Sequence, residues 1–229
     1  MAGAVPALVR DAPRALAGSV DRYAFISTIS AYRDWPYRAV DESSPCGTAT
    51  PISTPAPAGR WDPDAYGPLK VGCELAIRRE FGDNTLFIRP HVILGPGEYV
   101  GRLPWWLRRL VRGGRVLAPA PPDRAIHPVD VRDVARFTLD LIERQATGVC
   151  DVATPIGRET YGGMLQACKQ ATGSTAEFVW VEESWLAERG VLEWTEIPTG
   201  GQPVNCSLNS LANARLMAGS RPSTYRSVG

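Results

Sequence analysis

A tyrosine and a lysine four residues apart, Tyr66 and Lys70, stand near the start of an expected helix, in the segment DAYGPLK (64–70). Residues at i and i+4 lie on one face of a helix. An ammonium beside a phenol favours the phenolate and lowers the pKa of the phenol from about 10. Such a pair can exchange a proton with an oxygen whose carbon gains or loses a hydride. The alternative interpretation is an aromatic core residue beside a solvated lysine.

A second set of polar side chains ends the apolar segment YAFISTI (23–29), which predicts a buried strand. Ser27, Thr28 and Ser30 carry hydroxyl groups at or just beyond this strand end. Ligands of parallel sheets bind beyond the carboxyl ends of the strands. A hydroxyl there, opposite a helix that carries Tyr66, is placed to hydrogen-bond the reacting oxygen.

Helical and strand-like segments alternate along the rest of the chain, which predicts an α/β fold around a largely parallel sheet. A long loop is expected over 33–62, where proline, serine, threonine and alanine show no period. Pro13 should interrupt the first helix. The expected helices are 5–20, 65–81, 103–114, 129–145 and 160–173, and the expected strands are 23–29, 84–95, 149–154 and 176–183.

Composition narrows the functional class. The 229 residues are 44% hydrophobic and 21% charged with a net charge of +1, which is ordinary for a globular protein and gives no support to nucleic-acid binding. The N-terminus lacks the apolar run of a signal peptide, and no segment is apolar enough to span a bilayer. Five cysteines without a CxxC pair fit neither a zinc site nor a disulfide framework. We therefore expect a cytoplasmic protein with a small-molecule substrate and without bound metal, nucleic acid or membrane.

A run of arginines between Glu98 and Asp123 has two interpretations. Guanidinium groups bind anionic substrates such as diphosphates well. The run is more simply explained as the solvated face of a helix whose core side carries Trp106 and Leu110. Its members are Arg102, Arg108, Arg109, Arg112 and Arg115.

Four stretches, in their order and spacing, resemble the extended short-chain dehydrogenase/reductase family, the NAD-dependent epimerase/dehydratase group. The resemblance covers roughly residues 5–222 and implies a Rossmann-like fold. The stretches are FISTISAY (25–32), YGPLK (66–70), FIRPHVILGPG (87–97) and IHPVDVRDVA (126–135).

The resemblance assigns expected roles to individual residues. Tyr66 corresponds to the catalytic acid/base, and Lys70 to the lysine that lowers its pKa and holds the ribose of the nicotinamide. Thr28 corresponds to the catalytic serine or threonine, four residues before Tyr32. The cofactor, NAD or NADP, is expected to contact Ser27, Tyr66, Lys70, Pro90 and His91, and the substrate is expected to contact Arg102, Trp105, Arg124 and His127.

Members of this family begin with a strand, a glycine-rich turn and a helix whose N-terminus binds the pyrophosphate. No GxxGxxG pattern precedes Tyr66, and the glycines of GPGEYVG (95–101) follow a late strand instead. We therefore expect a partial Rossmann-like parallel sheet without its first βαβ half. Such a chain would be a fragment, the product of a misplaced start codon or a truncated gene product.

The expected organisation is the remaining half of the nucleotide-binding domain with interleaved substrate segments over 1–155, and a small, incomplete substrate lobe over 156–229. The function implied is NAD(P)-dependent redox or epimerase chemistry on an alcohol, a carbonyl or a sugar nucleotide. The alternatives are a non-catalytic binding or regulatory relative and an inactive truncated product. Because the strand 23–29 would be an exposed edge, we also expect aggregation or a homodimer.

Overall fold

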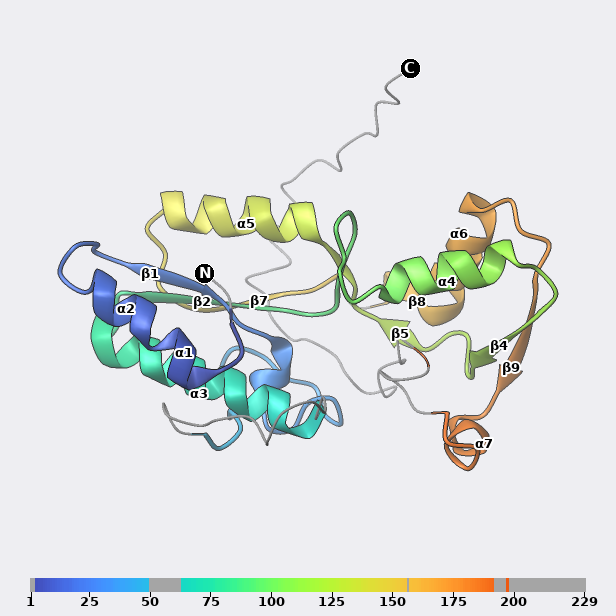
Figure 1. Cartoon of the computed structure of the whole chain (residues 1–229), viewed down its shortest axis with the longest axis horizontal. Helices are drawn as coiled ribbons and strands as arrows, with labels where there is room; N and C mark the ends of the chain where they lie inside the picture. The colour runs from blue at the N-terminus through green and yellow to red at the C-terminus, as the bar shows by residue number, and fades with distance from the viewer. Residues whose placement is uncertain (1–2, 50–62, 156, 192–196, 198–229) are drawn as a thin grey trace, which may run out of the picture.

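The computed structural model describes residues 3–49, 63–155, 157–191 and 197. Its N-terminal part is built on a parallel sheet in the order β1-β2-β7, formed by β1 (Tyr23–Ile26), β2 (Thr85–Pro90) and β7 (Gly148–Val152) (Figure 1). The neighbours are in parallel register, with Phe25 opposite Phe87 and Ile88 opposite Cys150. The predicted α/β fold with a parallel sheet is confirmed.

Helices cover both faces of this sheet (Figure 1). On one face lie α1 (Pro6–Val9), α2 (Asp11–Leu16) and α3 (Pro63–Phe81), and on the other lies α5 (Val131–Glu143). Side chains alternate along the strands, so that each face has its own apolar core. The core toward α3 contains Phe25, Ile77 and Phe87, and the core toward α5 contains Leu86, Ile88, Val134 and Phe137.

The first predicted helix is divided at Arg10, which separates α1 from α2. The interruption expected from Pro13 is confirmed, and Pro13 itself lies in the first turn of α2. A residue in that turn has no intrahelical N–H bond to lose, so proline is tolerated there. Because Pro13 has no N–H to donate to the Val9 carbonyl, the break falls in the turn before it.

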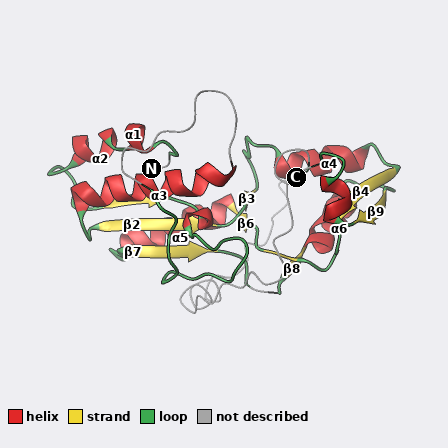
Figure 2. Cartoon of the chain, turned by 90° about the horizontal axis from the view of Figure 1, so that it is seen from below, coloured by secondary structure: helices red, strands yellow, loops and turns green. Residues whose placement is uncertain are grey.

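The second part of the molecule lies beside the first and has its own core (Figure 2). It contains α4 (Arg102–Val111), α6 (Tyr161–Ala171), α7 (Glu183–Ala187) and a parallel pair, β4 (Arg115–Pro119) and β9 (Glu177–Val181). Trp106, Leu110 and Leu165 are fully buried between the helices and this pair.

Two short strand pairs lie where the chain passes between the parts. These are β3 (Ile93–Leu94) with β6 (Val129–Asp130), and β5 (Ala125–Ile126) with β8 (Glu159–Thr160). The second part thus draws on segments before and after residue 155, and of the region 156–229 only 157–191 and 197 are described. Among the described residues, no helix combines the length and apolar character needed to cross a bilayer.

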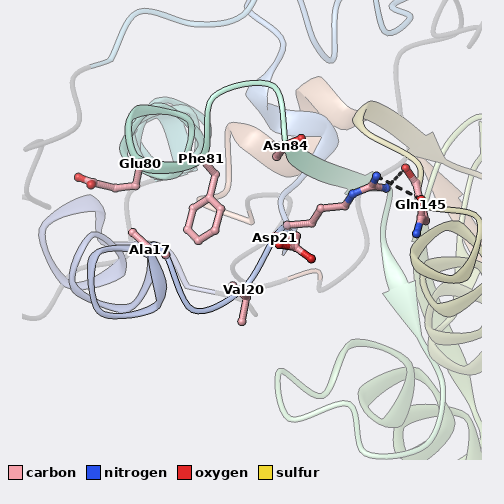
Figure 3. A pocket seen from close by; sticks show the side chains of 9 residues that line it. Ala17, Val20, Asp21, Glu80, Phe81, Asn84 and Gln145 are labelled. Carbon is pink, nitrogen blue, oxygen red and sulfur yellow. Dashed lines mark hydrogen bonds between the residues drawn. The ribbon is translucent and has the colours of Figure 1, made fainter.

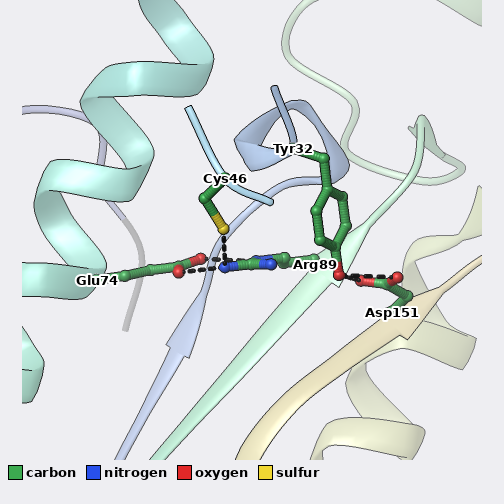
Figure 4. A network of polar contacts seen from close by, with 5 residues as sticks. All are labelled: Tyr32, Cys46, Glu74, Arg89 and Asp151. Carbon is green, nitrogen blue, oxygen red and sulfur yellow. Dashed lines mark hydrogen bonds and ion pairs between the residues drawn. The ribbon is translucent and has the colours of Figure 1, made fainter. Parts of the chain in front are cut away.

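A buried polar network ties α3 to the sheet (Figure 4). The Arg89 guanidinium on β2 donates to both Glu74 carboxylate oxygens, from Nε at 3.0 Å and from Nη2 at 2.6 Å, and Nη2 also lies 3.2 Å from Cys46 Sγ. The same guanidinium lies 4.6 Å from the centre of the Tyr32 ring. The Tyr32 hydroxyl lies 2.8 and 3.0 Å from the carboxylate oxygens of Asp151, which is fully buried on β7.

The carboxyl of Asp151 predicts a pH-dependent stability. Burial, assisted by the negative charge of Glu42, raises the pKa of Asp151 from 3.8 to about 7, against the opposing effects of Tyr32 and Arg89. The folded state therefore holds this proton more tightly than the unfolded state, so the free energy of unfolding should fall as pH rises between these two values.

Asp151→Asn should remove this fall, because the amide cannot ionise but can still accept the Tyr32 hydrogen bond. A tenfold change in proton affinity corresponds to about 1.4 kcal/mol of unfolding free energy. This value sets the scale by which the stability of Asp151→Asn should rise, relative to the native chain, from pH 5 to pH 8. Urea unfolding at both pH values measures it, with the exposed carboxyl variant Asp123→Asn as the control. Equal pH profiles for the native chain and Asp151→Asn would contradict this account.

The outer side of β1 carries a second prediction. Within the described sheet β1 pairs with β2 alone, so its other side is an edge, and unpaired edges promote association between chains. We expect self-association that grows with concentration in sedimentation velocity. A chain that stays monomeric across the concentration range and melts cooperatively would show that this edge is protected.

Candidate functional site

The carboxyl end of β1 and the N-terminal turns of α3 meet at a close backbone contact. A Cβ atom at Gly67 would lie 2.0 Å from the carbonyl oxygen of Ser30, so only glycine allows this approach. Ser30 belongs to the short 3-10 helix η1 (Ile29–Ala31), which Thr28 caps by accepting a hydrogen bond from the Ser30 N–H at 3.2 Å. The contact brings Tyr66 beside Thr28, and their side chains share a hydrogen bond.

The helix that carries Tyr66 begins earlier than predicted. Because α3 starts at Pro63 and not at residue 65, Pro68 lies in the second turn of the helix. Proline there removes one intrahelical hydrogen bond. The adjacent Gly67 and Pro68 therefore mark a segment of α3 in which the close approach to η1 takes precedence over helix propensity.

Lys70 lies one turn further along α3 and is almost completely buried, with 3% of its surface exposed. Its ammonium donates hydrogen bonds to the carbonyl oxygens of Ile26 at 2.6 Å and Gly3 at 2.7 Å, and it lies 4.2 Å from the centre of the Phe25 ring. Burial lowers the pKa of Lys70 from 10.5 to about 8, while Cys73 and Glu74 act in the opposite direction. Thr28, Tyr66 and Lys70 thus gather around the end of β1.

Composition offers a signal for Lys70 that motif spacing does not. Of the 25 lysine and arginine residues, only Lys70 and Lys169 are lysine. A compact ammonium can be held between two carbonyl groups, whereas a planar guanidinium with five donors does not fit that geometry. A chain that otherwise uses arginine almost throughout has lysine at the position where the structure requires one.

The protonation of Tyr66 differs from the sequence expectation. The pKa of Tyr66 is raised above its usual value of 10.0, chiefly by burial, while the hydrogen bond with Thr28 and the charge of Arg102 lower it. Lys70, which was expected to lower this pKa, directs its ammonium to the backbone carbonyls instead. Tyr66 therefore holds its proton at neutral pH, which suits a proton donor better than a base.

Two buried polar atoms at neighbouring strand ends have no hydrogen-bond partner among the described residues: Ser27 Oγ after β1 and His91 Nε2 after β2. Ser27 is 4% and His91 6% exposed. The His91 ring lies edge-on to Trp35, with centroids 4.7 Å apart, and to His127, at 5.3 Å. Burial and the neighbouring His127 hold the pKa of His91 well below its usual range, so its ring is neutral. Pro90, the last residue of β2, directly precedes His91.

The four expected substrate residues do not gather at one point. Arg102 begins α4, where its N–H and guanidinium contact the Glu98 carboxylate, and its charge acts on Tyr66. Trp105 packs edge-on against Trp106 in the second part, with centroids 4.8 Å apart.

The other two expected substrate residues are buried among the chain's own groups. Arg124 donates to the Ala120 carbonyl at 2.7 Å and pairs with Glu183. His127 Nδ1 lies 3.1 Å from the Thr154 carbonyl oxygen. Arg102 is the member of the four whose charge reaches Tyr66.

The arginine run mostly faces solvent. Arg108, Arg112 and Arg115 are exposed, while Trp106 and Leu110 on the opposite side of α4 are fully buried. The helix ends at two glycines in the left-handed region, Gly113 and Gly114, as the sequence predicts. This arrangement favours the interpretation of a solvated amphipathic helix.

A cavity of about 490 Å³ lies at the end of the sheet where the strands begin (Figure 3). Arg22, Asn84 and Gln145 line it, and each precedes one of the three strands. Ligands of parallel sheets bind at the other ends of the strands. This cavity is therefore separate from the Tyr66 site.

No protein-family model matches the chain, and no curated protein matches its sequence. Solved structures do match. A candidate epimerase from Burkholderia cenocepacia J2315 is similar with a TM-score of 0.63 and 21% identity, over 97% of this chain and 66% of that one. A dTDP-4-dehydrorhamnose reductase from Bacillus anthracis, solved with NADP, gives a TM-score of 0.59 and 16% identity, over 82% of this chain and 66% of that one.

A UDP-glucose 4-epimerase from Thermotoga maritima, solved with UDP-glucose, gives a TM-score of 0.57 and 19% identity, over 94% of this chain and 68% of that one. The chain thus spans about two thirds of the length of these structures. At such identities the similarity establishes the architecture: the chain has the Rossmann-like α/β fold of sugar-nucleotide epimerases and reductases.

Proposed function

We propose that the chain carries the proton-transfer centre of an NAD(P)-dependent reductase or epimerase that acts on an alcohol, a carbonyl or a sugar nucleotide. The supporting observation is the hydrogen bond between Tyr66 and Thr28 at the carboxyl end of β1, with the Lys70 ammonium anchored one turn away. The fold shared with such enzymes supports the same assignment.

The residues around this centre suit a nicotinamide nucleotide. Ser27 Oγ and His91 Nε2, which have no partner among the described residues, can hydrogen-bond a polar ligand, and Pro90 adjoins His91 in the chain. Lys70 can hold a ribose hydroxyl with a donor that Ile26 does not use. Either NAD or NADP fits these groups.

Hydride transfer is the chemistry that a bound nicotinamide supplies. In the reductive direction, Tyr66 donates its hydroxyl proton to the carbonyl oxygen as hydride arrives at the carbonyl carbon, so that the C=O bond becomes a C–OH group. The Thr28 hydroxyl orients Tyr66 and stabilises the phenolate that remains. Lys70 contributes by anchoring α3 to the Ile26 carbonyl, which holds Tyr66 beside Thr28. Arg102, whose charge reaches Tyr66, is placed to attract an anionic substrate group.

Tyr66→Phe should lower the rate of carbonyl reduction by about 10²- to 10⁴-fold, the range typical of a lost general acid. The measurement is NADPH or NADH oxidation at millimolar cofactor with dTDP- or UDP-linked keto sugars. Tyr37→Phe is the matched control, because Tyr37 is 78% exposed. A Tyr66→Phe chain as active as the native chain would contradict the assignment. A native chain without turnover would favour the non-catalytic alternative.

Dinucleotide binding should be weak in this chain. The glycine-rich turn that binds the pyrophosphate has no counterpart before Tyr66, and this turn with its helix N-terminus provides a favourable site for the diphosphate. Calorimetric titration with NADH and NADPH should give dissociation constants above the micromolar range. Micromolar affinity in a folded sample would contradict this expectation.

A further inference from the structure

Gly3 and Lys70 are 67 residues apart in the sequence, yet the Gly3 carbonyl oxygen lies 2.7 Å from the buried Lys70 ammonium. We propose that residues 3–5, which precede α1, act as an autoinhibitory strap, in which the Gly3 carbonyl takes the hydrogen bond that Lys70 would give to the ribose of a nicotinamide nucleotide. This inference rests on the proposed function, because that function gives Lys70 its ligand.

The two acceptors of Lys70 differ in kind. The backbone N–H groups of Tyr23 and Ser27 donate hydrogen bonds toward β2. Because the N–H of Ser27 and the carbonyl of Ile26 belong to one peptide group and point in opposite directions, the Ile26 carbonyl faces the outer side of β1. The Ile26 carbonyl is therefore a fixed part of the sheet edge, and its bond to Lys70 holds α3 in place. Gly3 belongs to no helix or strand and lies outside the sheet.

The strap is lightly held. Among the described residues, Gly3 and Ala4 make no hydrogen bond other than the one to Lys70. The helix that follows, α1, has four residues and no side-chain cap. Opening this segment costs one hydrogen bond, so a ligand that offers Lys70 a hydroxyl in its place can compete with it.

The position also requires glycine. A Cβ atom at residue 3 would lie 2.6 Å from Val9 Cγ2, closer than side-chain carbons approach each other. Val9 lies on α1, so a side chain at residue 3 requires that the strap or the branched Val9 side chain shift. Gly3→Ala should therefore open the strap, and Val9→Ala in the same chain should allow it to close again.

Lys70 reports on the strap directly. At pH 8 about half of its amine is neutral and nucleophilic, since its pKa is about 8. An amine-reactive ester followed by peptide mass spectrometry gives the labelling rate of Lys70, and Lys169, the other lysine of the chain, is the internal reference. We expect a several-fold higher Lys70 rate in Gly3→Ala and in a chain lacking residues 1–4. Gly3→Ala/Val9→Ala should return to the native rate, and Val9→Ala alone should match it.

Equal Lys70 labelling rates in all these chains would contradict the proposal that residues 3–5 shield Lys70. The competing ligand is tested with reduced nicotinamide mononucleotide, which carries the ribose without the adenosine half. It should protect Lys70 at lower concentration in Gly3→Ala than in the native chain. Equal protection in both chains would overturn the competition alone and leave the proposed function standing. Faster labelling without any protection would overturn the competition and count against the nicotinamide function as well.

Discussion

The hydrogen bond from the Lys70 ammonium to the Ile26 carbonyl is the contact on which the arrangement of the site depends. An ammonium removed from water is costly unless its donors are satisfied, and here two carbonyl groups and the Phe25 ring surround it. The remaining cost appears as the lowered pKa of Lys70. Because one of these carbonyls belongs to β1, the lysine fixes α3 against the strand end, and Tyr66 is held one turn away, beside Thr28.

The same stripe of α3 carries a second anchor. Tyr66, Lys70 and Glu74 are spaced by four residues and therefore lie on one helical face, toward the sheet. Glu74 pairs with Arg89 on β2, so α3 is tied to two adjacent strands by two buried charged groups. A buried ion pair contributes little net stability, but its geometry is specific. This specificity explains how the Gly67 contact with η1 is maintained although Pro68 removes one hydrogen bond of α3.

Local patterns in the sequence are sufficient for much of the fold. Periodicity predicts α5 and α6 and the strands β1 and β7, and the order of motifs places Thr28 and Tyr66 near each other. Short elements such as β8 and α7 lack enough residues to show a period. The break at Arg10, in contrast, follows from a local signal, because it falls in the turn before Pro13.

Chemical detail at the site is less predictable, because it depends on burial and on contacts distant in sequence. The motif spacing suggests that Lys70 lowers the pKa of Tyr66, but burial of the phenol dominates and raises it. The contact of Gly3 with Lys70 has no sequence signature at all. Glycine at residue 3 is explained only once Val9 is seen beside it.

The most direct test of this account is a ¹⁵N titration of the lysine ammonium groups, since the chain has only Lys70 and Lys169 and Lys169→Arg assigns the signals. The account predicts that Lys70 titrates near pH 8, with ammonium protons that exchange slowly because carbonyl groups hold them. A Lys70 signal that titrates at the ordinary value of 10.5 with rapid proton exchange would contradict it, because the ammonium would then lie in water and could not hold α3 against β1.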